Sequence, residues 1–311
     1  IKYYNSGESG KNFILSVLPD KQNNRILAGS VMNGLLVFDT LQSLIKHLRI
    51  TGDKGIPISP NIILKKKNGN YLLFASGEHK VWELDAGLNN IRTFPLHTTN
   101  TTDIKTSGYF GSPIYQHSDG AIVQTQNNLY KVNTRTNRVQ GTTFSKAYIM
   151  AGIFYNGKVL THGNDELLIT DTASFAEIRK IPFPNTGNVR CFAKDNYGNI
   201  WLGSNKGIFS TDISGNVNTQ YSKLTGLPDE CIYAMAFDNE NSLWCSTNKG
   251  ILKLSNGKVI EHLKKEDGLQ ENEFNTNVLA IASDGEMFFG GVNGISSFFP
   301  SQIIQDKDST Q

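Results

Sequence analysis

The stretch DNYGNIWLGSNKGI at residues 195–208 returns as DNENSLWCSTNKGI at residues 238–251, and a third copy, DGEMFFGGVNGI, occupies residues 284–295. The step from Trp201 to Trp244 is 43 residues, and the step from Trp244 to Phe288 is 44. A fixed period of this size, with strand-forming residues and a tight turn inside each unit, is typical of a β-propeller blade.

Weaker copies of the turn that closes each unit extend the period toward the N-terminus. These turns lie at Asn33-Gly34, Glu78-His79, Asn127-Asn128, Asn164-Asp165, Lys206-Gly207, Lys249-Gly250 and Asn293-Gly294. Their mean spacing is near 43 residues, so the 311 residues hold seven units. The sequence therefore predicts an all-β fold: a seven-bladed β-propeller of four-stranded antiparallel blades, as a single domain over residues 1–311.

One unit illustrates how the four strands of a blade are read from the sequence. Residues 189–193 and 200–203 are apolar and predict two strands joined by a polar turn. A tight turn at Gly207 leads to a third strand over residues 208–211, and a more polar fourth strand is predicted at the outer rim over residues 218–222.

The order of large and small residues in each unit predicts which residues fill the space between blades and where two blades come close together. Both faces of the middle strands are buried between neighbouring blades, so the tryptophans are predicted to be core residues. Small residues follow them, where neighbouring blades are expected to approach closely. The residues concerned are Trp82, Trp201 and Trp244, and then Gly29, Gly203, Ser246 and Gly290.

The two ends of the chain predict how the ring closes. Residues 1–4 look like a fourth strand without the rest of its blade, and the chain ends after a third strand over residues 295–299. We therefore expect residues 1–6 to provide the closing strand of the last blade, which removes an exposed sheet edge. Residues 301–311 are predicted to be a polar tail.

Composition and motifs exclude several classes of function. A formal net charge of +2 argues against a nucleic-acid or membrane-surface partner attracted by net charge. The Asp- and Gly-containing turns lack the spacing of a calcium loop, the six histidines form no ligand cluster in sequence, and no nucleophile elbow or phosphate-binding loop is present. The sequence therefore predicts no catalytic residue, no metal site and no cofactor.

The pattern Asp-x-x-Gly-x-Ile/Leu-Trp-x-Gly/Ser-Ser/Thr-x-x-Gly-Ile, preceded by TGLP at residues 225–228 or DGLQ at residues 267–270, resembles the two-component regulator propeller repeat. This resemblance implies an extracytoplasmic, periplasmic sensor domain of the kind found in hybrid two-component proteins of gut bacteria. Such proteins continue with a β-sandwich, a membrane helix and a histidine kinase or DNA-binding output, and many sense oligosaccharides released from glycans.

The entrance to the central channel is the predicted ligand site. Residues just ahead of or early in each first strand converge there, and polar and aromatic groups at such places suit sugar recognition. By repeat alignment Arg190, Tyr233 and Asn277 are equivalent, and Asn275, Tyr115 and Phe13 lie near comparable positions. The alternative interpretation is that these residues only satisfy loop backbone groups.

Three classes of function remain open at this point. The leading one is a non-catalytic domain that binds a small oligosaccharide or another small molecule. The others are a propeller-fold lyase or glycan-degrading enzyme, and a scaffold that binds proteins through its faces, because one fold hosts many activities. A second propeller, a β-sandwich domain or a homodimer partner are the further partners expected in a longer receptor.

Overall fold

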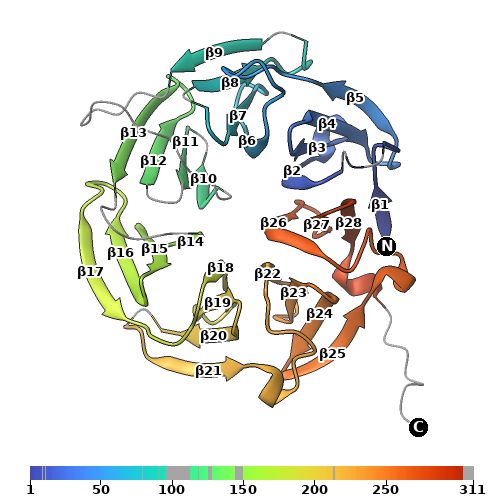
Figure 1. The fold of residues 1–311 in the computed structure, drawn as a ribbon. Helices are drawn as coiled ribbons and strands as arrows, with labels where there is room; N and C mark the ends of the chain where they lie inside the picture. The colour runs from blue at the N-terminus through green and yellow to red at the C-terminus, as the bar shows by residue number, and fades with distance from the viewer. Residues whose placement is uncertain are drawn as a thin grey trace.

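The computed structural model describes residues 1–8, 10, 12–78, 80–89, 91–95, 113–117, 119–124, 128–143, 150–212 and 214–303. Seven four-stranded antiparallel sheets form a ring, with the first strand of each sheet innermost around the axis (Figure 1). The predicted seven-bladed β-propeller is confirmed.

Within six of the blades the four strands follow one another along the chain. Blades 1 to 3 contain β2 (Ile14–Asp20), β3 (Arg25–Ser30), β4 (Gly34–Asp39), β5 (Leu44–Leu48), β6 (Pro60–Lys65), β7 (Tyr71–Ala75), β8 (Lys80–Leu84), β9 (Ile91–Pro95), β10 (Tyr115–His117), β11 (Gly120–Gln124), β12 (Asn128–Asn133) and β13 (Arg138–Thr143). Blades 4 to 6 contain β14 (Gly152–Tyr155), β15 (Lys158–Gly163), β16 (Glu166–Asp171), β17 (Glu177–Pro182), β18 (Val189–Lys194), β19 (Ile200–Ser204), β20 (Gly207–Thr211), β21 (Val217–Tyr221), β22 (Ala234–Phe237), β23 (Leu243–Thr247), β24 (Gly250–Ser255) and β25 (Lys258–Leu263). Blade 7 is built from β26 (Phe274–Ile281), β27 (Met287–Gly291), β28 (Gly294–Phe298) and β1 (Lys2–Tyr4). Short 3-10 turns occur at η1 (Lys21–Asn23), η2 (Lys223–Thr225), η3 (Lys265–Asp267) and η4 (Pro300–Gln302).

The predicted turns lie between the second and third strands of the blades, and their glycines have a steric reason. Gly207 has φ +106°, and a Cβ placed there would lie 2.0 Å from the carbonyl oxygen of Tyr221 on the outer strand. Gly250 repeats this arrangement one blade later, with φ +108°. Only glycine fits such a position without strain. Of the predicted turn residues, His79 and Asn127 lie outside the described residues.

Ring closure occurs as predicted, through the N-terminal strand. Lys2, Tyr3 and Tyr4 of β1 pair with Ser297, Ser296 and Ile295 of β28. Of the predicted polar tail, residues 301–302 belong to η4 and residues 304–311 lie outside the described part of the chain.

Close approach of neighbouring blades explains the small residues after the large ones. A Cβ at Gly29 would lie 1.9 Å from the carbonyl oxygen of Pro60, at the start of the first strand of the next blade. A Cβ at Gly203 would lie 2.7 Å from the side chain of Ile232, and one at Gly290 would lie 2.9 Å from Ile14. Each added methyl group would therefore push two blades apart.

All three tryptophans pack against the core, as predicted, but they differ in burial. Trp82 is 1% exposed and Trp244 is fully buried. Trp201 is only partly buried; its ring stacks on Tyr221 of the outermost strand and meets Phe237 of the next blade edge to face. Both indole N–H groups of the repeated motif still donate to the turn aspartate six residues earlier, Trp201 at 3.0 Å and Trp244 at 2.8 Å.

Buried carboxylates tie neighbouring blades together at the end of the ring opposite the second-to-third strand turns. Asp20 accepts hydrogen bonds from Lys65 of the next blade at 2.7 Å and from Tyr71, and it pairs with Arg25 at 3.2 Å. Burial alone would raise the pKa of Asp20, but the hydrogen bonds from Lys65 and Tyr71 outweigh it and lower the pKa to about 2.

We expect Asp20 to contribute stability that disappears in acid. Because its pKa is lower in the folded chain than in the unfolded one, this contribution is present above about pH 4 and is lost as the pH falls toward 2, with a size of about 2 kcal/mol. In urea unfolding, Asp20→Asn should lower the free energy of unfolding at neutral pH and flatten its dependence on pH in the acid range. The control is Asp119→Asn, at an exposed aspartate. An equal change in the free energy of unfolding in the two variants would show that Asp20 does not contribute this stability.

Candidate functional site

A β-bulge at the start of the innermost strand sets the direction of Arg190. In blade 5, Val189 pairs with Ser204 and Cys191 pairs with Gly203, so Arg190 is the extra residue between two paired positions. Such bulges redirect a side chain away from the regular alternation of the strand. Leu15 in blade 1 and Asn61 in blade 2 occupy the same bulge position.

Arg190 crosses from blade 5 to residues of blades 6 and 7. Its guanidinium carbon lies 4.8 Å from the ring centre of Tyr233, and its Nη1 donates to the hydroxyl of Thr276 at 3.5 Å. The backbone N–H of Asn277 donates to the carbonyl oxygen of Tyr233 at 2.8 Å. The three residues that the sequence analysis treated as equivalent, Arg190, Tyr233 and Asn277, therefore lie side by side at the inner ends of three consecutive blades.

The local backbone holds this group in place. Asn277 has φ +57°, a left-handed conformation that asparagine tolerates better than most residues. It sits in a break of the β26–β27 ladder, between the paired residues Phe274 and Leu279. β26 also lies close to β18, although β22 lies between these two strands in the ring.

Tyr233 supplies a neutral hydroxyl at the site. Burial, together with contact with Cys231, raises the pKa of Tyr233, so the phenol stays protonated at physiological pH. Its hydroxyl donates to Oδ1 of Asn248 at 2.8 Å. The phenol oxygen keeps lone pairs that can accept a hydrogen bond from a ligand hydroxyl.

The other three residues predicted to line the ligand site take no part in the contacts of Arg190 and Tyr233 described above. Asn275 is 9% exposed and donates to the backbone carbonyl of Ile14 at 2.6 Å, so it joins blade 7 to blade 1. Phe13 is 39% exposed and lies two residues ahead of the bulge residue Leu15. Tyr115 is the first residue of β10 and pairs with Ile122 in the middle of β11; its side chain lies outside the described part of the structure. Thr276 is the contact residue that the sequence analysis did not nominate, and its place between two nominated asparagines was the only signal for it.

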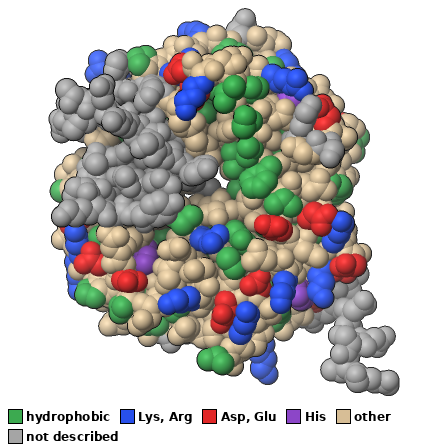
Figure 2. Space-filling view, in the orientation of Figure 1, with side chains coloured by type: hydrophobic (Ala, Val, Ile, Leu, Met, Phe, Trp, Pro, Cys, Tyr) green, Lys and Arg blue, Asp and Glu red, His purple; other side chains and the backbone are tan. Residues whose placement is uncertain are grey.

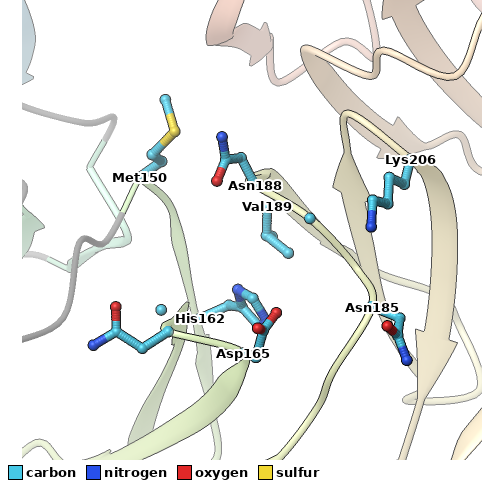
Figure 3. A pocket seen from close by; sticks show the side chains of 10 residues that line it. Met150, His162, Asp165, Asn185, Asn188, Val189 and Lys206 are labelled. Carbon is cyan, nitrogen blue, oxygen red and sulfur yellow. The ribbon is translucent and has the colours of Figure 1, made fainter.

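A pocket of about 400 Å³ opens between blades 4 and 5 at the same end of the blades (Figure 3). Its walls come from the β15–β16 turn, the segment entering β18 and the β19–β20 turn. The side chains that define its chemistry are His162, Asp165, Asn185, Asn188, Val189 and Lys206. Val189 lines this pocket, and the next residue, Arg190, contacts Tyr233. The start of β18 therefore lies between the pocket and the group formed by Arg190, Tyr233 and Thr276.

His162 is the buried titratable group of this pocket. Burial lowers the pKa of His162, and its ring lies 3.0 Å from the hydroxyl of Thr186 and 3.4 Å from the carbonyl oxygen of Phe183. In Figure 3, Lys206 stands across the pocket from His162 and Asp165. The pocket thus offers amides and one charge of each sign to a polar ligand.

Hydrophobic side chains also gather on this end of the molecule, over blades 1 and 2 (Figure 2). In these two blades, exposed apolar residues lie ahead of β2 (Phe13), in the β3–β4 turn (Val31 and Met32) and ahead of β6 (Ile56), and Met32 is the most exposed of the four at 58%. Two of them adjoin, since the N–H of Val31 donates to the carbonyl oxygen of Phe13 at 3.0 Å.

The repeated turn aspartates are occupied by the chain itself. Asp195 accepts from the backbone N–H groups of Tyr197 and Asn199 at 3.0 and 2.8 Å, and Asp238 forms the same pattern one unit later. Among the described residues, no group of three or more His, Cys, Asp or Glu side chains is placed to hold a metal ion.

One repeat of the chain is similar in sequence to a known family. Residues 182–206 match the two component regulator propeller. The match covers the segment entering β18, the strand β18 itself and β19, and it supports the resemblance drawn from the repeated motif. No curated protein matches the chain in sequence.

Solved structures similar to the chain include two from B. thetaiotaomicron. The extracellular domain of the putative hybrid two component system BT3049 has 16% sequence identity and a TM-score of 0.72, with 95% of this chain and 40% of that chain covered. The extracellular domain of the putative one component system BT4673 has 15% identity and a TM-score of 0.70, with 95% and 39% covered. The chain thus spans about 40% of the length of these two structures.

A streptogramin B lyase structure is also similar. It has 12% identity and a TM-score of 0.73, with 95% of this chain and 96% of that chain covered. At this identity the likeness shows the shared propeller fold alone. Within the part of the chain that the structure describes, no helix is long and apolar enough to cross a membrane.

Proposed function

We propose that this propeller is a ligand-sensing domain of a bacterial two-component-type receptor, located outside the cytoplasmic membrane, that binds a small oligosaccharide at the channel entrance. The observation that carries the proposal is the convergence of Arg190, Tyr233 and Thr276 from three blades. The propeller repeat match and the two extracellular domains of similar fold support the receptor context.

The chemistry of this group suits a sugar. An aromatic face can stack on the CH face of a pyranose ring, and the guanidinium and hydroxyl groups can bond its hydroxyls. Residues from three blades around one opening can contact several sugar positions at once. A bound ligand would then also link the three blades. Binding could in this way change how the blades sit against one another, which is a change that a sensor can transmit.

The rest of a receptor would supply the signal output. Because the chain spans about 40% of the two extracellular domains it resembles, we expect a second propeller, a β-sandwich domain or a homodimer partner to contact this domain. The net charge of +2 gives no reason to expect a nucleic-acid or membrane-surface partner.

Binding without conversion is the expected result for a sensor. Thermal-shift screening of glycan oligosaccharides should find a ligand that raises the melting temperature, because a ligand that binds only the folded state stabilises it. Calorimetry should then give a saturable isotherm, and chromatography of the recovered ligand should show it unchanged. Conversion of the ligand by the purified chain would favour the lyase or glycan-degrading alternative.

Substitutions at the channel entrance should separate binding from stability. Arg190→Ala and Tyr233→Ala should leave the melting temperature nearly unchanged, because both side chains lie at the inner blade ends with part of their surface exposed. Each should weaken ligand binding by at least about tenfold, as expected for the loss of a hydrogen-bonded charge or a stacking ring. Unchanged affinity in both variants would place the ligand elsewhere.

A further inference from the structure

Arg190 differs from the other inter-blade cations in having no carboxylate. At two blade junctions a buried carboxylate receives a cation from the next blade: Glu286 of blade 7 binds Lys21 of blade 1, and Asp20 of blade 1 binds Lys65 of blade 2. Arg190 forms no ion pair with any residue that the structure describes. The hydrogen bond from Arg190 to Thr276 is long at 3.5 Å.

Arg25 is an internal comparison, because it makes the same aromatic contact. The guanidinium carbon of Arg25 lies 5.0 Å from the ring centre of Tyr71, and that of Arg190 lies 4.8 Å from the ring centre of Tyr233. In the first pair Asp20 completes the group, with its carboxylate 3.2 Å from Nε of Arg25. In the second pair Nε of Arg190 is buried and has no hydrogen-bond partner.

An unpartnered buried donor on a charged group is costly, and folded chains rarely keep one without a use. Packing alone does not require arginine at this bulge, since blade 1 places Leu15 there. The group that is missing around Arg190 is an anionic acceptor, which guanidinium binds through two parallel hydrogen bonds.

From this comparison we infer that the channel-entrance site takes a ligand with an anionic oxygen group, a carboxylate or a sulfate, which binds Arg190 next to the Tyr233 ring. This inference rests on the proposed function and adds the charge of the ligand to it. The anion neutralises the guanidinium of Arg190, as Asp20 neutralises that of Arg25. The remainder of the ligand lies toward Thr276 and Tyr233.

Matched saccharides test the inference by calorimetry. Digalacturonate and α-1,4-galactobiose differ only in carrying carboxylates or hydroxymethyl groups, and sulfated and unsulfated N-acetylgalactosamine disaccharides form the second pair. We expect at least one acidic member to bind at least about tenfold more tightly than its neutral partner, with a preference that weakens in high salt. The two pairs distinguish a carboxylate from a sulfate.

Variants then locate the anion. Arg190→Gln should remove the preference for the acidic member, and Arg190→Lys should restore only part of it because the planar fork is lost. Lys206→Gln removes one positive charge from the same end of the molecule and should keep the preference, as should Arg25→Gln, which lowers the melting temperature instead.

The outcomes are distinguishable. Equal affinity for acidic and neutral members, or loss of the preference in Lys206→Gln and not in Arg190→Gln, would overturn the inference and leave saccharide sensing intact. Binding of no saccharide of either kind would overturn the proposed function and the inference with it.

Discussion

Deleting residues 1–6 should cause the largest loss of stability of any short truncation in this chain. The deletion removes β1 and exposes the edge of β28, whose backbone groups lose their partners at Ile295, Ser296 and Ser297. It also removes Tyr4, which is fully buried between Phe38 of blade 1 and Phe288 of blade 7, with ring centres 5.8 and 6.1 Å away.

Several separate losses of stability add up when residues 1–6 are deleted. Loss of a buried aromatic side chain alone costs about 3 to 5 kcal/mol. Glu286, fully buried, would lose its 3.2 Å contact with Lys2 and keep Lys21. We expect a strongly lowered unfolding midpoint in urea and increased aggregation in light scattering, since an open sheet edge pairs with other chains.

A point variant separates the two causes. Tyr4→Ala keeps the strand and its ladder, so it should destabilise the fold without the rise in aggregation. Unchanged melting and solubility of the truncated chain would mean that residues 2–4 do not close the ring.

Trp244→Ala should destabilise the chain by about 3 to 5 kcal/mol, the cost of a large-to-small change in a packed core. Trp244 is fully buried, packs on Phe298 with ring centres 4.9 Å apart, and donates to Asp238. Trp201→Ala should cost less, because Trp201 keeps part of its surface exposed.

The variant Trp244→Phe separates the contribution of packing to stability from that of the hydrogen bond to Asp238. The third repeat unit already has Phe288 in this place, so Trp244→Phe should keep most of the packing and lose the bond to Asp238, at about 1 to 2 kcal/mol. Chemical denaturation of the three variants gives the comparison. A larger loss for Trp201→Ala than for Trp244→Ala would contradict the burial difference.

Most of the fold could be predicted from the 43-residue sequence repeat. A turn recurs at the same place in each unit, although its residues differ between units, so a 43-residue repeat was enough to predict the blade number, the strand order and ring closure through residues 1–6. Trp201 shows the limit of repeat reasoning: equivalent positions need not be equally buried, because its neighbours Tyr221 and Phe237 are not the neighbours of Trp244.

The site was predictable only in part. Repeat alignment found Arg190, Tyr233 and Asn277, because equivalent residues of a ring meet near its axis. It gave neither the reach of Arg190 to Thr276, 86 residues away, nor the linking role of Asn275, because both depend on how bulges in β18 and β26 turn the side chains. The pocket between blades 4 and 5 is formed by turns of different sequence and leaves no repeated pattern.

A crystal structure of the chain with the tightest-binding saccharide of the screen would show where the ligand binds. We expect density for the ligand at the channel entrance, in contact with Arg190, Tyr233 and Thr276. A ligand bound in the pocket beside His162 and Lys206, or on the hydrophobic surface around Met32, with Arg190 untouched, would contradict this expectation.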